Sequence, residues 1–364
     1  MHVYNIINRA LTSGSNIEIC IGLQLEPSFF QYSMSENISS IKPHLNYQEL
    51  VQLLKQRGMI IHNEDYAIKK LTQINYYRLS GFWYLCKKLE LDNNLQPVLC
   101  SNTNKPKRLE LFEYNTSFNE VIKFYRFDKQ LRLLILDAIE RIEIYMRSII
   151  AHEIGKYNSL AYTDTNFIAP IYLKDFYTKN NVLRNNWQEW SNKNLNQINK
   201  SQEDFIVWHK LNNKPIPIWA VVETWDFGLM SKYYSMLKAQ YKNKIIKNLE
   251  FRETEVLIEW LQAINNLRNK CAHHSRVWNQ YNNNPIKVLN NSYFNKLNLD
   301  KNATHRIYGL ICIINFLLQK ICPNNSWINE IVQLINTKPS LPNCNFISMG
   351  INSISGLDIS IFKN

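Results

Sequence analysis

Four polar side chains stand close together at the end of an otherwise apolar helical pattern. Arg268 and Asn269 come first, and His273 and His274 follow. Histidine exchanges protons near neutral pH, and arginine offers a fixed fork of donors to phosphate oxygens. RNA carries its own nucleophile, the 2′-hydroxyl, so its cleavage needs only a base, an acid and positive charge for the developing phosphorane. These residue types indicate metal-free phosphodiester cleavage as the chemistry of this segment.

The spacing of Arg268 and His273 limits how they act together. They are five residues apart, which on an ideal helix is about 140° of rotation and about 7.5 Å of rise. Two such side chains border one pocket without sharing a helix face. A compact phosphate pocket therefore needs a second contributor, and the same helix of a dimer mate is the simplest one. Alone, this spacing is a weak signal, because an arginine and a histidine also close helices for structural reasons.

Other chemistries fit these residues less well. Cys271 with His273 and His274 suggests a metal site, but no second ligand pair has suitable spacing, so we expect no metal and no cofactor. Cys271 also falls on the apolar stripe, which makes it a poor nucleophile. The chain contains no glycine-rich phosphate loop of the known patterns.

Two long helices are expected to position the segment. The first opens at Thr254, and its apolar residues recur at three- and four-residue steps up to Cys271. The second, over residues 118–156, is the longest helical signal and should be a spine of the domain. Its other face is charged, with Asp128 and Arg132 among opposite charges four residues apart, worth about 0.2–0.5 kcal/mol each. Glu140 and Glu143 belong to the same ion-pair pattern, although Glu140 or Arg141 is also a candidate to line a pocket.

The rest of the chain is helical in pattern as well. Helices are expected to begin near Tyr47 and Glu64 and to cover residues 218–228, 231–238, 304–322 and 327–336. The 364 residues include 9 glycines and 11 prolines, few for a fold rich in tight turns, while 45% are hydrophobic. An all-α fold is therefore predicted. We expect a loosely ordered extension over residues 1–33 (with Met34 as an alternative natural start), a helical region over 34–110, a helical domain over 111–338 and an irregular tail over 339–364.

The charge balance favours a polyanionic partner. The chain has 42 Lys and Arg against 30 Asp and Glu, a formal charge of +12, and a basic protein attracts nucleic acid. For the aromatic block at residues 75–84, core packing is a stronger interpretation than direct stacking on RNA. For residues 90–110, a solvated loop is a stronger interpretation than a loop that contacts phosphates. Candidate RNA-binding residues are Tyr77, Arg78, Lys105, Lys107, Arg108 and Arg276.

The cellular setting follows from what the sequence lacks. Its seven cysteines have no CxxC spacing, which fits a reducing compartment. The start has no signal-peptide pattern. The longest apolar stretch, residues 307–318, is shorter than the roughly 20 residues that span a bilayer. We therefore expect a cytoplasmic protein without a membrane partner.

Residues 268–279 resemble the signature of the Abi (abortive infection, AbiD/AbiF-like) proteins of the HEPN superfamily, whose nucleases carry an Arg-x4-His motif. Other blocks support the resemblance, which covers residues from about 42 to 335. These blocks are residues 42–45, 57–61, 74–81, 127–132, 140–143 and 219–231.

The resemblance implies a HEPN-like helical bundle with an additional N-terminal helical region, a homodimer, and a toxin-type endoribonuclease in anti-phage defence. RNA would be cut by 2′-hydroxyl attack, leaving a 2′,3′-cyclic phosphate. Arg268 would stabilise the phosphate, His273 would be the general base or acid, and Asn269 would orient the pocket. His274 would either assist or have a structural role. Some members are associated with a small non-coding RNA, which makes such an RNA an expected partner. The alternative is a protein that binds a structured small RNA without cleaving it.

Overall fold

The computed structural model describes residues 42–362, so the predictions for residues 1–33 and Met34 lie outside the described residues. From Tyr47 onward the chain forms one compact unit. The domain boundaries predicted from the sequence stay predictions.

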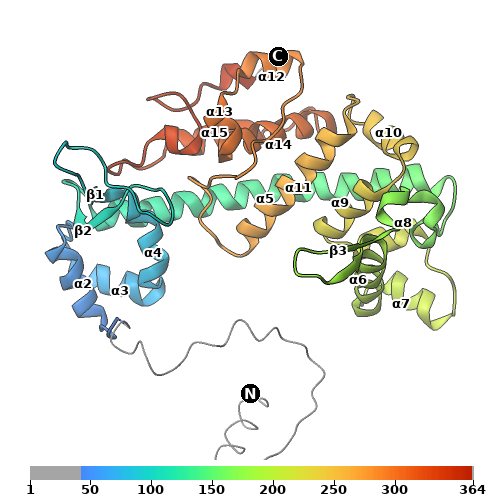
Figure 1. Ribbon diagram of the computed structural model, residues 1–364, viewed down its shortest axis with the longest axis horizontal. Helices are drawn as coiled ribbons and strands as arrows, with labels where there is room; N and C mark the ends of the chain where they lie inside the picture. Colours follow the sequence, from blue (N-terminus) through green and yellow to red (C-terminus); the bar gives the residue numbers. More distant parts are fainter. Residues whose placement is uncertain (1–41, 363–364) are drawn as a thin grey trace, which may run out of the picture. The chain divides into compact units, whose positions relative to one another are not determined.

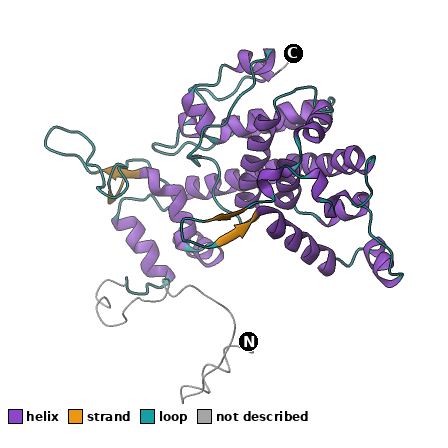
Figure 2. Ribbon diagram, turned by 45° about the vertical axis from the view of Figure 1, so that its right-hand side comes forward, coloured by secondary structure: helices purple, strands orange, loops and turns teal. Residues whose placement is uncertain are grey.

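The described chain is mostly helical, which confirms the predicted fold class. It is 59% helix, with 14 helices and two small two-stranded sheets, and Figure 2 shows how little of the ribbon is strand. The sheets are antiparallel: β1 (Lys87–Leu89) pairs with β2 (Arg108–Phe112), and β3 (Asp175–Tyr177) pairs with β4 (Leu183–Asn185). Among the helices of residues 42–362, none combines the length and hydrophobicity needed to cross a lipid bilayer.

The spine of the unit is α5 (Phe118–Gly155), as the sequence predicts. Its 38 residues correspond to a length of about 57 Å at 1.5 Å per residue. Helices α4, α9, α11, α14 and α15 all contact it, and Figure 1 shows it running through the middle of the bundle. The other helices are α2 (Tyr47–Gln56), α3 (Glu64–Gln73), α4 (Tyr76–Trp83), α6 (Asn186–Lys200), α7 (Asp204–Leu211), α8 (Ile218–Val221), α9 (Phe227–Met236), α10 (Ala239–Lys247), α11 (Thr254–Ala272), α12 (Ser292–Leu297), α13 (Lys301–His305), α14 (Ile307–Ile321) and α15 (Trp327–Asn336).

Helix α11 opens at Thr254, as predicted, and buries the predicted apolar stripe except for Val256, which is only partly buried. Leu257, Trp260, Leu261, Ile264, Leu267 and Cys271 are all buried. They face α5, α9 and α14, which contact α11. The residues between them stay at least partly accessible, so α11 presents one polar face that ends at the candidate motif.

Several boundaries differ from the sequence prediction. The expected helix over residues 218–228 ends at Thr224, because the Asp226 side chain accepts from the Leu229 N–H at 2.7 Å and caps the start of α9. Gly228 therefore lies in the first turn of α9 and does not end a helix. The expected helix over 304–322 is divided at Arg306, whose extended backbone (φ −119, ψ 175) separates α13 from α14. The loop predicted over residues 90–110 ends in strand β2.

Candidate functional site

The C-terminal turn of α11 carries both candidate histidines on its outside. The N–H of His274 donates to the carbonyl of Cys271 at 3.0 Å, and the N–H of Ser275 donates to that of Lys270 at 2.8 Å. This pattern normally has glycine at the left-handed position. Here His274 occupies it with a φ of 58°, a conformation that is strained for a residue with a Cβ. Both His273 and His274 are exposed, so solvent and ligands can reach their imidazoles.

The structure divides the four predicted catalytic residues between two cavities. Arg268 and Asn269 line a cavity of about 670 Å³ between α6, α9 and α11, which we call the α6–α11 cavity. His273 and His274 line a separate depression of about 410 Å³ beside α4, which we call the α4 cavity. Within one chain, Arg268 and His273 therefore line different cavities, whereas the sequence analysis expected them to border one pocket.

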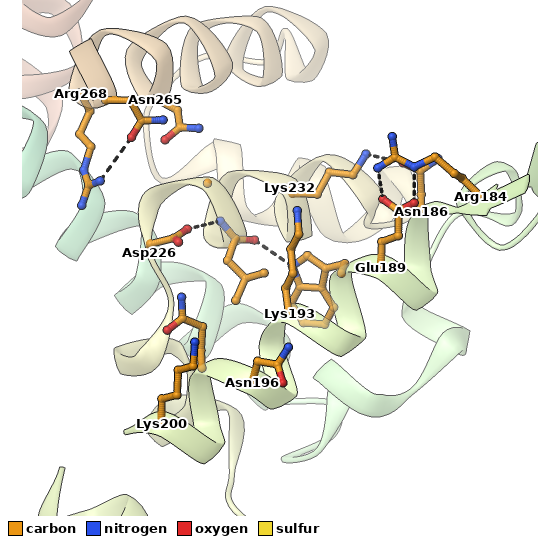
Figure 3. A pocket seen from close by; sticks show the side chains of 15 residues that line it. Arg184, Asn186, Glu189, Lys193, Asn196, Lys200, Asp226, Lys232, Asn265 and Arg268 are labelled. Carbon is orange, nitrogen blue, oxygen red and sulfur yellow. Dashed lines mark hydrogen bonds and ion pairs between the residues drawn. The ribbon is translucent and has the colours of Figure 1, made fainter. Parts of the chain in front are cut away.

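The α6–α11 cavity is rich in positive charge (Figure 3). Five basic side chains line it, against two acidic ones. Arg184 is paired with Glu189, and Asp226 is engaged in capping α9, so both acids already have partners. The basic residues are Arg184, Lys193, Lys200, Lys232 and Arg268.

Arg268 enters the cavity from α11 half-buried. Its Nη1 lies 3.3 Å from the Asn269 Oδ1, to which it donates. Among the described residues it forms no ion pair within 4.0 Å. Glu143 on α5 is near enough for the positive charge of Arg268 to lower its pKa, while burial acts more strongly and raises that pKa overall. A partly buried carboxylate thus lies close to Arg268.

Glu143 belongs to an ion pair that fixes one wall of the cavity. Arg147, one turn along α5, pairs with Glu143 and donates to the carbonyl of Trp225. Trp225 directly precedes Asp226, the capping residue of α9. The spine helix therefore holds the turn that leads into the cavity wall, and the prediction that Glu143 forms an ion pair is confirmed. Glu140 and Arg141, the alternative pocket residues, line neither of the two cavities.

The close contact of α9 with α11 depends on Gly228. A Cβ at this position would lie 3.2 Å from the Asp226 Oδ1 and 3.3 Å from the Asn265 Nδ2. Both distances are tighter than usual for a Cβ. Glycine therefore lets the first turn of α9 approach α11 beside Arg268.

A second ion pair on α5 holds the chain that leaves the α11 turn, and it corrects the sequence prediction. Asp128 and Arg132 were expected on the charged face opposite the apolar stripe, but their side chains are 0% and 5% exposed. Asp128 Oδ1 accepts from the N–H groups of Val277 and Trp278, each at 2.9 Å. The buried pair thus provides acceptors for a turn that would otherwise leave backbone N–H groups unsatisfied. Burial raises the pKa of the Asp128 carboxyl, while Arg132 and the two N–H groups act in the opposite direction.

The α4 cavity brings two predicted RNA-binding residues to the histidines. Arg78 and Arg276 line it together with His273 and His274. Arg78 Nη1 donates to the His274 carbonyl at 2.8 Å. The Arg276 guanidinium packs against Gly81, where a Cβ would lie 3.5 Å from its Nη1. Burial lowers the pKa of Arg276, an effect that the nearby Asp128 opposes.

The other predicted RNA-binding residues line neither cavity. Tyr77 is 67% exposed and packs edge-on against Tyr76. Lys105 and Lys107 are exposed in the segment between β1 and β2. Arg108 donates to the carbonyls of Leu85 and Lys87, at 2.9 and 2.5 Å, so its guanidinium holds the β1–β2 region together.

The sequence analysis missed the cationic side chains contributed by α6 and α9. On α6, polar residues recur at positions 189, 193, 196, 197 and 200, while Trp190, Asn194 and Ile198 are buried. That spacing places the residues along one face of the helix, and this pattern was a signal in the sequence for an accessible basic face. Lys232 comes from α9 and had no such signal, because only the packing of α9 on α6 turns it toward the cavity.

The cysteines within residues 42–362 are buried or half-buried and form no metal-binding cluster. Cys271 is 1% exposed, and burial raises the pKa of its thiol to about 12, so it is a buried packing residue as predicted. The six cysteines of the described chain are free. Within residues 42–362, no three His, Cys, Asp or Glu side chains gather closely enough to hold a metal ion.

Comparison with known proteins identifies one family. Residues 69–279 match the family model described as Abi-like protein. The match is shorter than the predicted resemblance over 42–335 and leaves out the blocks before residue 69, but it includes α11 and the whole of both cavities. No curated protein and no solved structure is similar enough to match.

Proposed function

The chain belongs to the Abi-like protein family, which is associated with abortive infection, an anti-phage defence, and from this premise we propose that it is a metal-independent endoribonuclease of the HEPN superfamily. It cuts RNA by attack of the 2′-hydroxyl on the adjacent phosphate. One observation carries the proposal: a single helix end presents a half-buried arginine toward a cationic cavity and two exposed histidines beside two more arginines.

Each residue of the motif has a distinct role in this mechanism. Arg268 donates to the non-bridging phosphate oxygens as charge develops on them. His273 takes the proton of the 2′-hydroxyl or delivers one to the leaving 5′-oxygen. Asn269 holds the Arg268 guanidinium through the 3.3 Å hydrogen bond. His274 assists from the strained turn, where its backbone is held by Arg78.

The two-cavity arrangement supports a site shared between two chains. Because Arg268 and His273 of one chain line different cavities, a phosphate in contact with both needs a second copy. In a two-fold symmetric dimer, the same surface of each copy meets the other, so Arg268 of one chain faces His273 of its partner and the reverse. The homodimer is therefore part of the proposed mechanism.

The same separation also favours a second candidate function. If Arg268 and a histidine never contact the same phosphate, the chain would bind a structured small RNA with its basic surfaces without cleaving it. Both candidates bind RNA with strong salt dependence. They differ in product, because only the nuclease makes 2′,3′-cyclic phosphate ends.

The deciding experiment incubates the purified protein with total RNA and maps the ends of the products. We expect cyclic phosphate ends, and unchanged cleavage when a chelator is added. Arg268→Ala and His273→Ala should each lower the rate at least about 100-fold, since general acid–base groups and phosphate clamps contribute this much. Arg252→Ala and His62→Ala are the matched controls, because both residues are exposed and line neither cavity. Wild-type rates in folded Arg268 and His273 variants would refute the nuclease.

A mixing experiment tests the shared site. When Arg268→Ala and His273→Ala chains are mixed and allowed to exchange, half of the dimers pair one of each. Each mixed dimer then has one intact site and one site with both defects. About a quarter of the wild-type rate should return. If both motif residues of a site came from the same chain, every site would stay defective and no activity would return.

A further inference from the structure

Lys193 and Lys200 are exposed cations without a carboxylate partner. Among the described residues, neither forms an ion pair within 4.0 Å, and both lie on the face of α6 that lines the α6–α11 cavity. They are seven residues apart, which is two helical turns and about 10.5 Å of rise. Figure 3 shows Arg268 across the cavity from them, on another helix. The positive charge is therefore spread along the cavity.

Lys232 adds a cation whose position is fixed. Its Nζ donates to the Asn186 Oδ1 at 2.8 Å and lies 5.2 Å from the centre of the Tyr172 ring. Burial lowers its pKa, the carboxylate of Glu189 opposes this, and the charges of Lys193 and Arg184 lower the pKa further. The fold thus holds like charges near one another, an arrangement that an incoming anion stabilises.

The extent of the cationic surface indicates the kind of anion. A single phosphate cannot contact cations two helical turns apart on α6 and also Arg268 on α11, whereas a chain of phosphates can. Trp190, the tryptophan that lines the cavity, is 2% exposed and donates its indole N–H to the Leu229 carbonyl. It is therefore unavailable for stacking on bases. The basic side chains that line the cavity suit contacts to backbone phosphates, which do not depend on base sequence.

The geometry points to the α6–α11 cavity as a phosphate track, in which Lys193, Lys200 and Lys232 hold the backbone of a single RNA strand leading to Arg268. The identification of the strand as RNA rests on the proposed function. These contacts bind the strand on one side of the phosphodiester that Arg268 contacts, and they do not depend on base sequence. It adds residues of α6 and α9 to a site that the motif alone places on α11.

The test measures binding of a single-stranded 2′-O-methyl RNA, which lacks the 2′-hydroxyl nucleophile, by fluorescence anisotropy over a range of salt concentrations. The test variant is Lys193→Gln/Lys200→Gln. The control, Lys247→Gln/Lys301→Gln, removes the same charge from exposed positions outside the cavity. Each phosphate contact contributes about 0.7 to the slope of log K against log salt for single strands. The test variant should lose about 1.4 of that slope and bind about tenfold more weakly near 0.15 M salt, for oligonucleotides of any sequence.

Several outcomes overturn the track. One is a test variant whose slope and affinity equal those of the control. Another is a loss of inorganic phosphate or nucleoside triphosphate binding, measured by thermal shift, with RNA binding unchanged, which would mark a small-anion site. The nuclease proposal can fail separately. If wild-type protein leaves no cyclic phosphate ends but the test variant shows the slope change, the nuclease is refuted and the phosphate track is supported. Cleavage that depends on Arg268 and His273, with no slope change, removes only the track.

Discussion

Replacing Arg132 by methionine leaves the Asp128 carboxylate buried without its counter-charge. The two side chains are 5% and 0% exposed, so water cannot take the place of the guanidinium. Removing one partner of a buried pair costs about 3–5 kcal/mol. The bond from Arg132 to the Ser275 carbonyl is long, at 3.4 Å, and adds little. We expect the free energy of unfolding to fall by about 3–5 kcal/mol at neutral pH, a large share of the roughly 5–15 kcal/mol typical of a domain.

The loss should shrink as the pH falls. Burial already raises the pKa of Asp128 above 3.8 with Arg132 present, and without Arg132 this pKa rises further. A carboxyl with a raised folded-state pKa binds its proton more readily in the folded chain than in the unfolded one. Between the folded-state pKa of the variant and the lower one of the wild type, each unit of falling pH therefore returns about 1.4 kcal/mol. The deficit is full above the folded-state pKa of the variant and smallest below that of the wild type.

Urea unfolding followed by tryptophan fluorescence at several pH values measures this effect. The buried Trp278, whose N–H is bound by Asp128, is a nearby reporter. The control is the double variant Arg132→Met/Asp128→Asn, which removes both charges and keeps an Oδ1 acceptor for Val277 and Trp278. It should recover most of the stability and show no such pH dependence. The reasoning is refuted if the single variant lies within about 1 kcal/mol of wild type, or if its deficit is the same at every pH.

Two further substitutions test the strain and the charge that the fold tolerates at the site. His274→Gly should raise the free energy of unfolding by about 0.5–1 kcal/mol, because glycine adopts a φ of 58° without a Cβ penalty; an unchanged or lower thermal midpoint would contradict this. Lys232→Met should raise the thermal midpoint at neutral pH and weaken RNA binding, because burial lowers the pKa of Lys232 and so makes its protonated form unfavourable in the fold. That gain should shrink as the pH rises through the lowered pKa toward 10.5, where wild-type Lys232 also becomes neutral; a gain that persists at high pH would rule out the charge as its cause.

The ion pairs of α5 explain why a long helix carries so many charged residues. Asp128–Arg132 holds the turn after α11, and Glu143–Arg147 holds the turn before α9. Each pair provides acceptors or donors for backbone groups of a connecting segment. Each of the two cavities beside α11 is therefore bordered by a connecting segment that this one helix anchors, a support that functional loops commonly need.

The sequence by itself determined the helices and the candidate motif. The apolar spacing places α5, α11 and α15 within a residue or so of their bounds, because helical periodicity is a local property of the chain. The same periodicity buries Cys271 and puts Arg268 and His273 on different sides of α11. The spacing of arginine and histidine alone was a weak signal, and the motif gained weight from its place on an apolar helix and from the similar blocks elsewhere in the chain.

Only the tertiary structure decided what surrounds that motif. The sequence of α5 does not distinguish a solvated ion pair from a buried one, because the difference lies in whether distant segments such as residues 275–278 need polar partners. The sequence of α9 does not turn Lys232 toward Arg268, because that depends on how α9 packs on α6 and α11. Basic side chains from residues 184–200, 232 and 268 form the cationic cavity only through packing. The division of Arg268 and His273 between two cavities is likewise decided by packing.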